Sequence, residues 1–341
     1  MPPAAPDIRA TSAVAERTTP PARSAFLRFV HLQCLRRTQK TADLLAVVRS
    51  DPSPSAVHDL RVAARRLVSA LDCFSTVLNT GRAAGIRKRL KGILSAARPV
   101  RELDVALEHV SAAGMSFECP LATALRLRRD TAAGSLGEQL RRKRYQHLTR
   151  RWLSTADDAE TATERDSLEA TATSGMASTQ LPWIPDESCA SNASRVLPLL
   201  AAQYFHQGRT ACAEGASQEA LHSFRLDGKR LRYCLEIFRD QYGPSLDARI
   251  KTLRDIQRQL GILSDCETNA RLLRSAGMPR DAASEGLLTI LRQRQEDATE
   301  SFLADWKAHL GTLEVERDWR DYLALSSEET SSICGGSPEM G

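Results

Sequence analysis

The sequence is poor in aromatic residues, which make up only 5% of its 341 positions. Proteins that bind single-stranded nucleic acid usually stack bases on aromatic rings, so this scarcity argues against that class. None of the eight cysteines forms a C-x-x-C pair, and neither an H-E-x-x-H sequence nor a Gly-rich Walker loop is present. The common zinc-finger, metalloprotease and P-loop signatures are therefore missing.

Long apolar stretches are missing as well. No run of about 18 uncharged apolar residues occurs, so we expect no transmembrane helix and no membrane partner. Residues 1–23 are rich in Pro, Ala and Thr and lack the apolar core of a secretory signal, and they are predicted to form a disordered leader. Scattered cysteines without a signal indicate reduced thiols in a cytoplasmic protein.

Charge is distributed very unevenly along the chain. The net charge of +5 combines +14 in residues 24–153, −7 in residues 154–187 and zero in residues 188–322, with small contributions from the two ends. Such asymmetry points to an anionic partner for the first half. A basic face that is simply solvated is the alternative that charge alone leaves open.

Helix-forming residues dominate between the prolines, and alternating strand patterns are scarce, so the sequence predicts an all-α fold. Residues 24–153 and 188–322 are each long enough for roughly four helices. The acidic residues 154–187 are predicted to form a flexible linker, and residues 323–341 a disordered tail.

An internal repeat relates the two halves. Residues 53–74 can be laid on residues 217–238 with a constant offset of 164 positions. Basic residues match as follows: His58 with His222, Arg61 with Arg225, Arg65 with Lys229, and Arg66 with Arg230. This agreement indicates a duplication that also copied the basic residues.

Each repeated helix carries a basic stripe beside the apolar stripe that faces the core. The first stripe holds His58, Arg61 and Arg65, and the second holds His222, Arg225, Lys229 and Arg232. Cations on successive turns repel one another by a few tenths of a kcal/mol per pair. We expect neither stripe to have a carboxylate four residues further on. An external polyanion would then supply the counter-charge, with Arg clamping phosphate oxygens and His donating to them.

Four blocks of sequence resemble the CHAD domain, the conserved-histidine α-helical domain. They are VHDLRVAARRLVSALDCF (57–74), LKGILSAARPVRELDVAL (90–107), LHSFRLDGKRLRYCLEIF (221–238) and LRDIQRQLGILSD (253–265). The resemblance implies two pseudo-symmetric four-helix bundles around a basic cavity or groove. It also implies binding of inorganic polyphosphate and localisation to polyphosphate granules.

The resemblance also marks individual positions. The main expected contacts to polyphosphate are His58, Arg61, Arg65 and Arg66 in the first half, and His222, Arg225, Lys229, Arg230 and Arg232 in the second. Secondary contacts are expected from Lys91, Arg101, Arg254 and Arg258. The chain departs from the family pattern at Val68, where Arg is frequent, and at Ser264, where Asn is common.

Two other functions compete with a non-catalytic, cofactor-free polyphosphate binder. One is nucleic-acid binding through charge alone. The other is a phosphohydrolase or phosphotransferase with His58 or His222 as nucleophile. Phosphoryl transfer normally needs metal-binding carboxylates or a positioned base, and the stripes contain neither. Four nearby acids, Glu102, Asp104, Asp265 and Glu267, are expected to form salt bridges between helices. The sequence does not define an oligomeric state.

Overall fold

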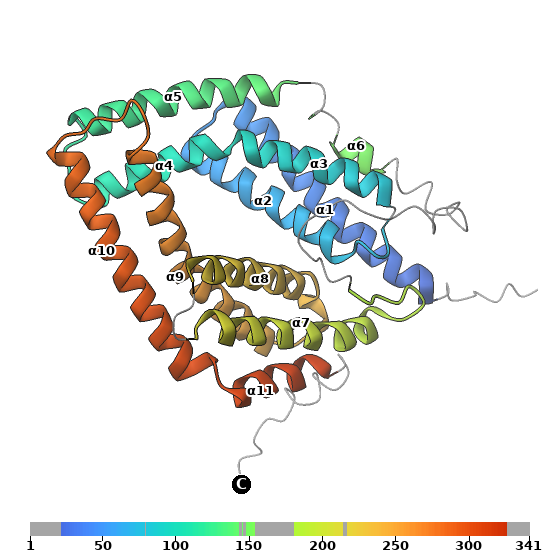
Figure 1. Cartoon of the computed structure of the whole chain (residues 1–341). Coiled ribbons are helices and arrows are strands. Elements are labelled where there is room, and N and C mark those ends of the chain that lie inside the picture. The colour runs from blue at the N-terminus through green and yellow to red at the C-terminus, as the bar shows by residue number, and fades with distance from the viewer. Residues whose placement is uncertain are drawn as a thin grey trace, which may run out of the picture.

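The structure is a computed structural model that describes residues 22–78, 80–142, 145, 148–153, 181–213 and 217–325. Throughout these ranges the regular elements are helices, with no strand among them (Figure 1), which confirms the predicted all-α class. Residues 1–21 of the predicted leader, 154–180 of the predicted linker and 326–341 of the predicted tail lie outside the described residues. No helix in the described ranges is long and apolar enough to cross a membrane.

Six α-helices in the described ranges come from the first half of the chain. They are α1 (Ala22–Ser50), α2 (Pro54–Cys73), α3 (Thr80–Ala96), α4 (Arg98–Ala112), α5 (Pro120–Leu140) and α6 (Leu148–Leu153). Proline starts several of them, because its fixed φ suits the first helical turn and its missing N–H is not needed there. Pro54 does this for α2, directly after the extended Ser53.

The second half supplies the remaining helices. They are α7 (Cys189–Ala211), α8 (Gln218–Ile237), η2 (Arg239–Gln241), α9 (Ser245–Leu273), α10 (Ala282–Asp305), η3 (Trp306–Leu310) and α11 (Leu313–Ala324). Side-chain caps begin several of these helices. Ser217, the residue before α8, accepts a hydrogen bond from the Ala220 N–H at 3.2 Å.

A single large core joins the two halves. Its buried side chains come from α1 and α2 as well as from α7, α8 and α11. Helices α2 and α8, which are the two repeated helices, pack directly on each other. At this contact the buried Sγ atoms of Cys73 and Cys234 lie 3.1 Å apart.

A second apolar cluster joins the halves at another point. It contains Leu103 of α4 and Leu125 of α5 together with Leu273 of α9 and Leu287 of α10. Figure 1 shows α9 and α10 running from the lower helices up to α4 and α5. The halves are therefore held together at the α2–α8 contact and again where α4 and α5 meet α9 and α10.

The end of the predicted flexible linker is firmly packed. Trp183 is 5% exposed, lies 5.3 Å from the Phe238 ring, and donates from Nε1 to the Cys73 carbonyl at 2.6 Å. Leu181 is buried as well. Composition alone predicted a linker through residue 187, but these two apolar side chains fill the core beside α2 and α8.

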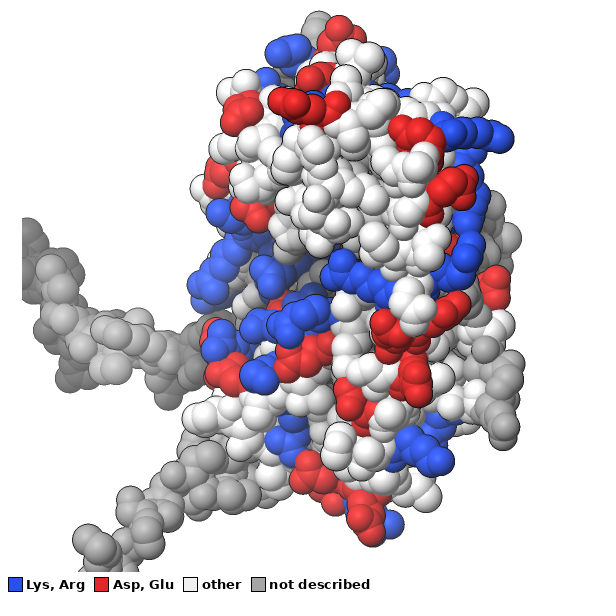
Figure 2. Space-filling view, turned by 90° about the vertical axis from the view of Figure 1, so that its left-hand side faces the viewer, with Lys and Arg blue, Asp and Glu red and all other residues white. Residues whose placement is uncertain are grey.

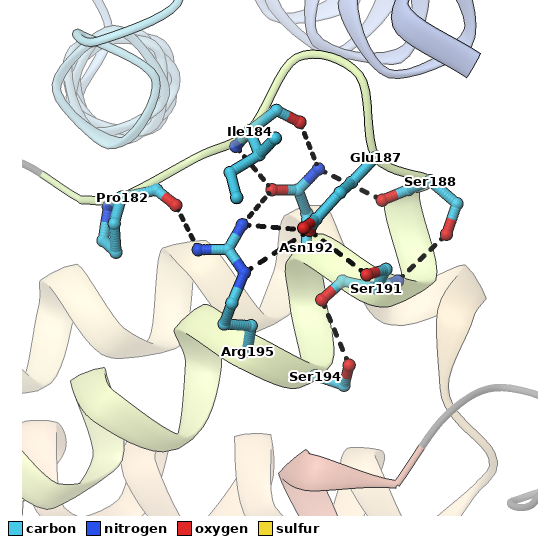
Figure 3. A network of polar contacts seen from close by, with 8 residues as sticks. All are labelled: Pro182, Ile184, Glu187, Ser188, Ser191, Asn192, Ser194 and Arg195. Carbon is cyan, nitrogen blue, oxygen red and sulfur yellow. Dashed lines mark hydrogen bonds and ion pairs between the residues drawn. The ribbon is translucent and has the colours of Figure 1, made fainter.

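Polar contacts attach the same segment to the start of α7 (Figure 3). The Asn192 side chain accepts from the Ile184 N–H and donates back to the Ile184 carbonyl, both at 2.8 Å. Arg195 pairs with Glu187 at 3.1 Å and also donates to the Pro182 carbonyl. Because its backbone groups are bonded to α7, this segment is part of the fold from residue 181 onwards.

The predicted tail likewise begins too early. Leu323 in α11 is fully buried, and its carbonyl accepts a hydrogen bond from the Tyr242 hydroxyl at 2.8 Å. Helix α11, in which Trp319 and Leu323 are buried, ends at Ala324, two residues past the predicted boundary at residue 322.

Candidate functional site

A cleft with a volume of about 700 Å³ lies where α2, α4, α8 and α9 meet. We call it the basic cleft. It collects predicted site residues from both halves: His58, Arg61, Arg65, Arg101, His222, Arg225, Lys229 and Arg230. On the face shown in Figure 2, lysine and arginine side chains gather in a band across the middle of the molecule, between areas that are mostly uncharged or acidic.

The apolar stripe of each repeated helix determines where its basic stripe lies. In α2, Leu60, Leu67 and Leu71 are fully buried. Arg61 and Arg65 lie one turn apart on the adjacent face, which borders the cleft. Since α8 repeats the pattern and packs against α2, the two stripes line the same cleft.

Burial shapes the electrostatics of the first stripe. Arg61 Nη1 donates to the Leu94 carbonyl at 3.0 Å, while its buried Nε has no hydrogen-bond partner among the described residues. Burial, with Arg65 as the next cause, lowers the pKa of Arg61 to about 10. Burial and the nearby Arg101 also lower the pKa of His58. The cleft therefore disfavours charge on its own cations.

The second stripe shows the same effect more strongly. Burial, followed by the charges of Arg225 and Arg65, lowers the pKa of Lys229 to about 7. The pKa of Arg225 is also lowered by burial, and Asp265 opposes this shift. Neither Lys229 nor Arg65 has a hydrogen-bond or ion-pair partner in the described part of the chain. An anion in the cleft would stabilise the charged form of Lys229.

Four carboxylates also line the cleft: Asp72, Glu102, Asp227 and Asp265. Two are already paired, Asp72 with Arg87 at 2.6 Å and Glu102 with Arg98 at 2.8 Å.

The expected salt bridge between helices forms for one of the four acids, because Asp104 of α4 pairs with Arg129 of α5 at 3.0 Å. Glu102 and Glu267 pair within their own helices instead, with Arg98 at 2.8 Å and with Arg271 at 3.5 Å. Asp265 differs, because no ion pair to it is found among the described residues. It lies instead beside Arg225 and Lys229, where its negative charge opposes the lowering of their pKa values by burial.

Five predicted contacts lie outside the basic cleft. Arg66 and Arg254 line a different groove. Arg232 is largely buried, with Nε bonded to Gln257 at 2.8 Å. Lys91 is exposed on α3, and Arg258 is exposed on α9 with Asp255 3.0 Å away, and neither lines the cleft.

The expectation that neither stripe has a carboxylate one turn further on is wrong for the second stripe. Arg232 Nη1 lies 2.7 Å from Glu236 Oε1, an i,i+4 pair within α8. Glu236 also lies 3.4 Å from Arg66 and 3.3 Å from Arg254. One carboxylate thus serves three guanidinium groups, and Arg232 is partly neutralised from within.

Some residues of the cleft were not predicted. Arg98, Thr268 and Asn269 line it, and Asn269 is 1% exposed with no hydrogen-bond partner for either amide atom among the described residues. Helical spacing could have indicated both residues. Arg98 lies three residues before Arg101, and Asn269 lies one turn after Asp265, so each shares a helix face with a residue already singled out. Val68 and Ser264, the two departures from the family pattern, also border the cleft.

The fold and this site define an all-helical protein in which two repeated basic helices border one cation-lined cleft. The CHAD domain matches residues 31–274, which is more than half of the chain, so the protein belongs to the CHAD domain family. No curated protein matches the chain.

Two solved structures have a similar fold. The CHAD domain from the plant Ricinus communis is 21% identical, with a TM-score of 0.58 over 93% of this chain and 96% of that one. PptA from Streptomyces chartreusis is 18% identical, with a TM-score of 0.56 over 84% of this chain and 99% of that one. At these identities the likeness concerns the fold alone.

Proposed function

We propose that the basic cleft binds inorganic polyphosphate without chemically changing it. The observation that carries this proposal is the pair formed by Arg65 of α2 and Lys229 of α8. Both line the cleft, neither has an ion-pair partner in the described part of the chain, and they come from equivalent positions of the two repeats. Cations that lie close together repel one another, so they are suited to a ligand that brings closely spaced negative charges.

Polyphosphate fits the chemistry of the cleft better than a nucleic acid does. It presents charged oxygens at short intervals and has no bases to stack. Tyr233 is the one Tyr, Phe or Trp side chain among the described residues of the lining, and it is 6% exposed. The Arg232 guanidinium covers its ring at 4.4 Å. The cleft thus offers donors to phosphate and no free Tyr, Phe or Trp ring for a base.

The proposal extends to the architecture and the place of action. The halves, 24–153 and 188–322, would act as two pseudo-symmetric four-helix bundles that share the groove, each contributing one stripe. Binding to the polymer would concentrate a cytoplasmic protein on polyphosphate granules. Neither step requires a cofactor or an enzymatic activity.

Titration at matched salt tests the proposal. Long-chain polyphosphate, tRNA and duplex DNA would each be titrated into the full chain, and polyphosphate should bind most tightly. The Arg61→Glu, Arg225→Glu double variant should lose most of this affinity while keeping its helicity. Arg274→Glu with Arg280→Glu is the matched control, since it makes the same change in charge at exposed positions that line no part of the cleft.

Other outcomes would point elsewhere. Equal or tighter binding of tRNA or DNA would favour the nucleic-acid alternative. Steady release of phosphate with Mg²⁺ or Mn²⁺, abolished by His58→Ala, would show an enzyme rather than a binder. An equal effect of the control variant would mean that affinity follows net charge and not the cleft.

A further inference from the structure

A second groove, with a volume of about 790 Å³, lies beside the α2–α8 contact and shares no lining residue with the basic cleft. Its walls come from α1, α2, the end of α8 with η2, and the first half of α9. On α2 the two sites use neighbouring positions: Arg65 lines the cleft and Arg66 the second groove. Successive helical residues are turned by about 100°, so one helix serves two sites.

The second groove is as basic as the cleft. Its lining has seven Lys and Arg side chains against three carboxylates, compared with seven against four in the cleft. The cations are Arg36, Arg37, Lys40, Arg66, Arg239, Lys251 and Arg254, and the acids are Asp59, Glu236 and Asp247. A groove with this excess attracts anions, and its field is concentrated by the apolar walls around it.

The cations on α1 are the most available for a ligand. Arg36 and Lys40 lie one turn apart and are exposed, and neither has an ion-pair or hydrogen-bond partner among the described residues. Between them, Arg37 is held by its own helix: Nη1 donates to the Gln33 carbonyl at 2.9 Å and to Gln33 Oε1 at 2.7 Å. Both bonds are to neutral oxygens, so the charge of Arg37 is also left for a ligand.

The opposite wall is organised around a single carboxylate. Glu236, with a side chain only 13% exposed, lies within 3.5 Å of Arg66, Arg232 and Arg254. Three guanidinium groups around one carboxylate leave a local excess of two positive charges. Glu236 thus fixes these groups in place without neutralising them, which favours an anion that approaches from the side of Arg36 and Lys40.

We propose that the second groove is a separate polyphosphate site, so that one protein molecule holds two strands of the polymer and cross-links them. This inference rests on the proposed function of the basic cleft and adds a second binding event to it. Linear polyphosphate is the expected occupant because the groove, like the cleft, combines many cations with an open lining, and none of the described residues that line the groove is aromatic.

Stoichiometry with a short oligomer tests this directly. Calorimetric titration of the full chain with tripolyphosphate, which is too short to occupy both sites, should give two bound oligomers per molecule. Arg36→Glu with Lys40→Glu should reduce this to one, and so should Arg61→Glu with Arg225→Glu. The exposed control pair Arg274→Glu with Arg280→Glu should keep both.

A bridging assay measures the consequence. Polyphosphate attached to beads should capture labelled free polyphosphate through the native protein, and each groove variant should lose most of this capture. Circular dichroism checks that the variants fold, and the milder pair Arg36→Gln with Lys40→Gln guards against misfolding caused by charge reversal.

The outcomes separate the two proposals. One bound oligomer in the native protein, unaffected by Arg36→Glu with Lys40→Glu, would refute the second site and leave the cleft intact. If Arg36→Glu with Lys40→Glu lost all binding while Arg61→Glu with Arg225→Glu lost none, the second groove would be the sole site. That result would overturn the two-strand arrangement. No binding of any polyphosphate would refute the proposed function itself.

Discussion

Arg232 and Glu236 lie one turn apart on α8, and their Nη1 and Oε1 atoms are separated by 2.7 Å. Because the same carboxylate also lies near Arg66 and Arg254, it is an internal counterion at the edge of the second groove. Glu236 therefore does for these three cations part of what a bound phosphate would do, and it competes with the ligand for them.

Replacing this counterion should separate stability from binding. Glu236→Gln removes a negative charge from the second groove, so affinity for polyphosphate should rise several-fold. The same change leaves the largely buried Arg232 guanidinium without its charged partner, which should lower the free energy of unfolding by about 3 kcal/mol. Urea unfolding and titration at low salt measure the two effects. Asp318→Asn, which removes an exposed partner of Arg249, is the control. It should change neither the free energy of unfolding nor the affinity for polyphosphate by much.

The basic stripes could be predicted because helical geometry is local. Spacings of three, four and seven residues place side chains on one face whatever surrounds the helix, and the repeat indicated which stripes to expect beside one another. The position of Lys91 and Arg258 could not be obtained in this way. Their faces depend on which side of α3 and α9 packs inward, and the structure turns both side chains to solvent.

The packed end of the linker depends on contacts that are distant in sequence. Trp183 bonds to the carbonyl of Cys73, 110 residues earlier, and this pairing leaves no periodic signal. The acidic stretch before Trp183 dominates the composition of residues 154–187. Composition therefore gave no sign that Leu181 and Trp183 are buried. Likewise, Glu236 follows Arg232 by one turn, but its approach to Arg66 depends on how α2 and α8 pack.

Trp183 should therefore contribute to stability far more than a linker residue would. Its ring lies 5.5 Å from Phe74 and 5.3 Å from Phe238, so it joins aromatic side chains of both halves. Trp183→Ala should lower the free energy of unfolding by about 3–5 kcal/mol through the lost contacts and the cavity left behind. Ile184→Ala, at a side chain that is 39% exposed, should cost much less. Similar losses for both variants in urea unfolding would contradict this role.

Asp265 should weaken the binding of a polyanion. It borders the basic cleft beside Arg225 and Lys229 without an ion-pair partner in the described residues. Asp265→Asn should raise polyphosphate affinity by about 2–5-fold, as expected for one repulsive charge near a surface cleft. Glu267→Gln, two residues further on and paired with Arg271 outside the cleft, is the control. Unchanged or weaker binding of the Asp265→Asn variant would place the polymer away from this wall.

Lys229 should make binding depend on pH. With a pKa lowered to about 7, the free amino group is mostly neutral at pH 8 and mostly charged at pH 6. A bound polyanion favours the charged form and so raises this pKa, which means that binding takes up a proton. Affinity should therefore rise as pH falls from 8 to 6. For one proton the slope cannot exceed about tenfold per pH unit. His58, whose pKa is also lowered by burial, adds uptake at the acidic end of this range.

Lys229→Arg distinguishes this mechanism from a general effect of charge. Arginine stays charged throughout the range, so the variant should bind more tightly than the native protein at pH 8 and show a shallower pH profile. Proton uptake is measured by calorimetry in two buffers of different ionisation enthalpy, with long-chain polyphosphate so that titrating end groups contribute little. Lys229→Met should lose both the uptake and part of the affinity. If the native protein takes up no proton on binding, the amino group of Lys229 does not contact the polymer, and the cations of the first stripe are then the ones to test.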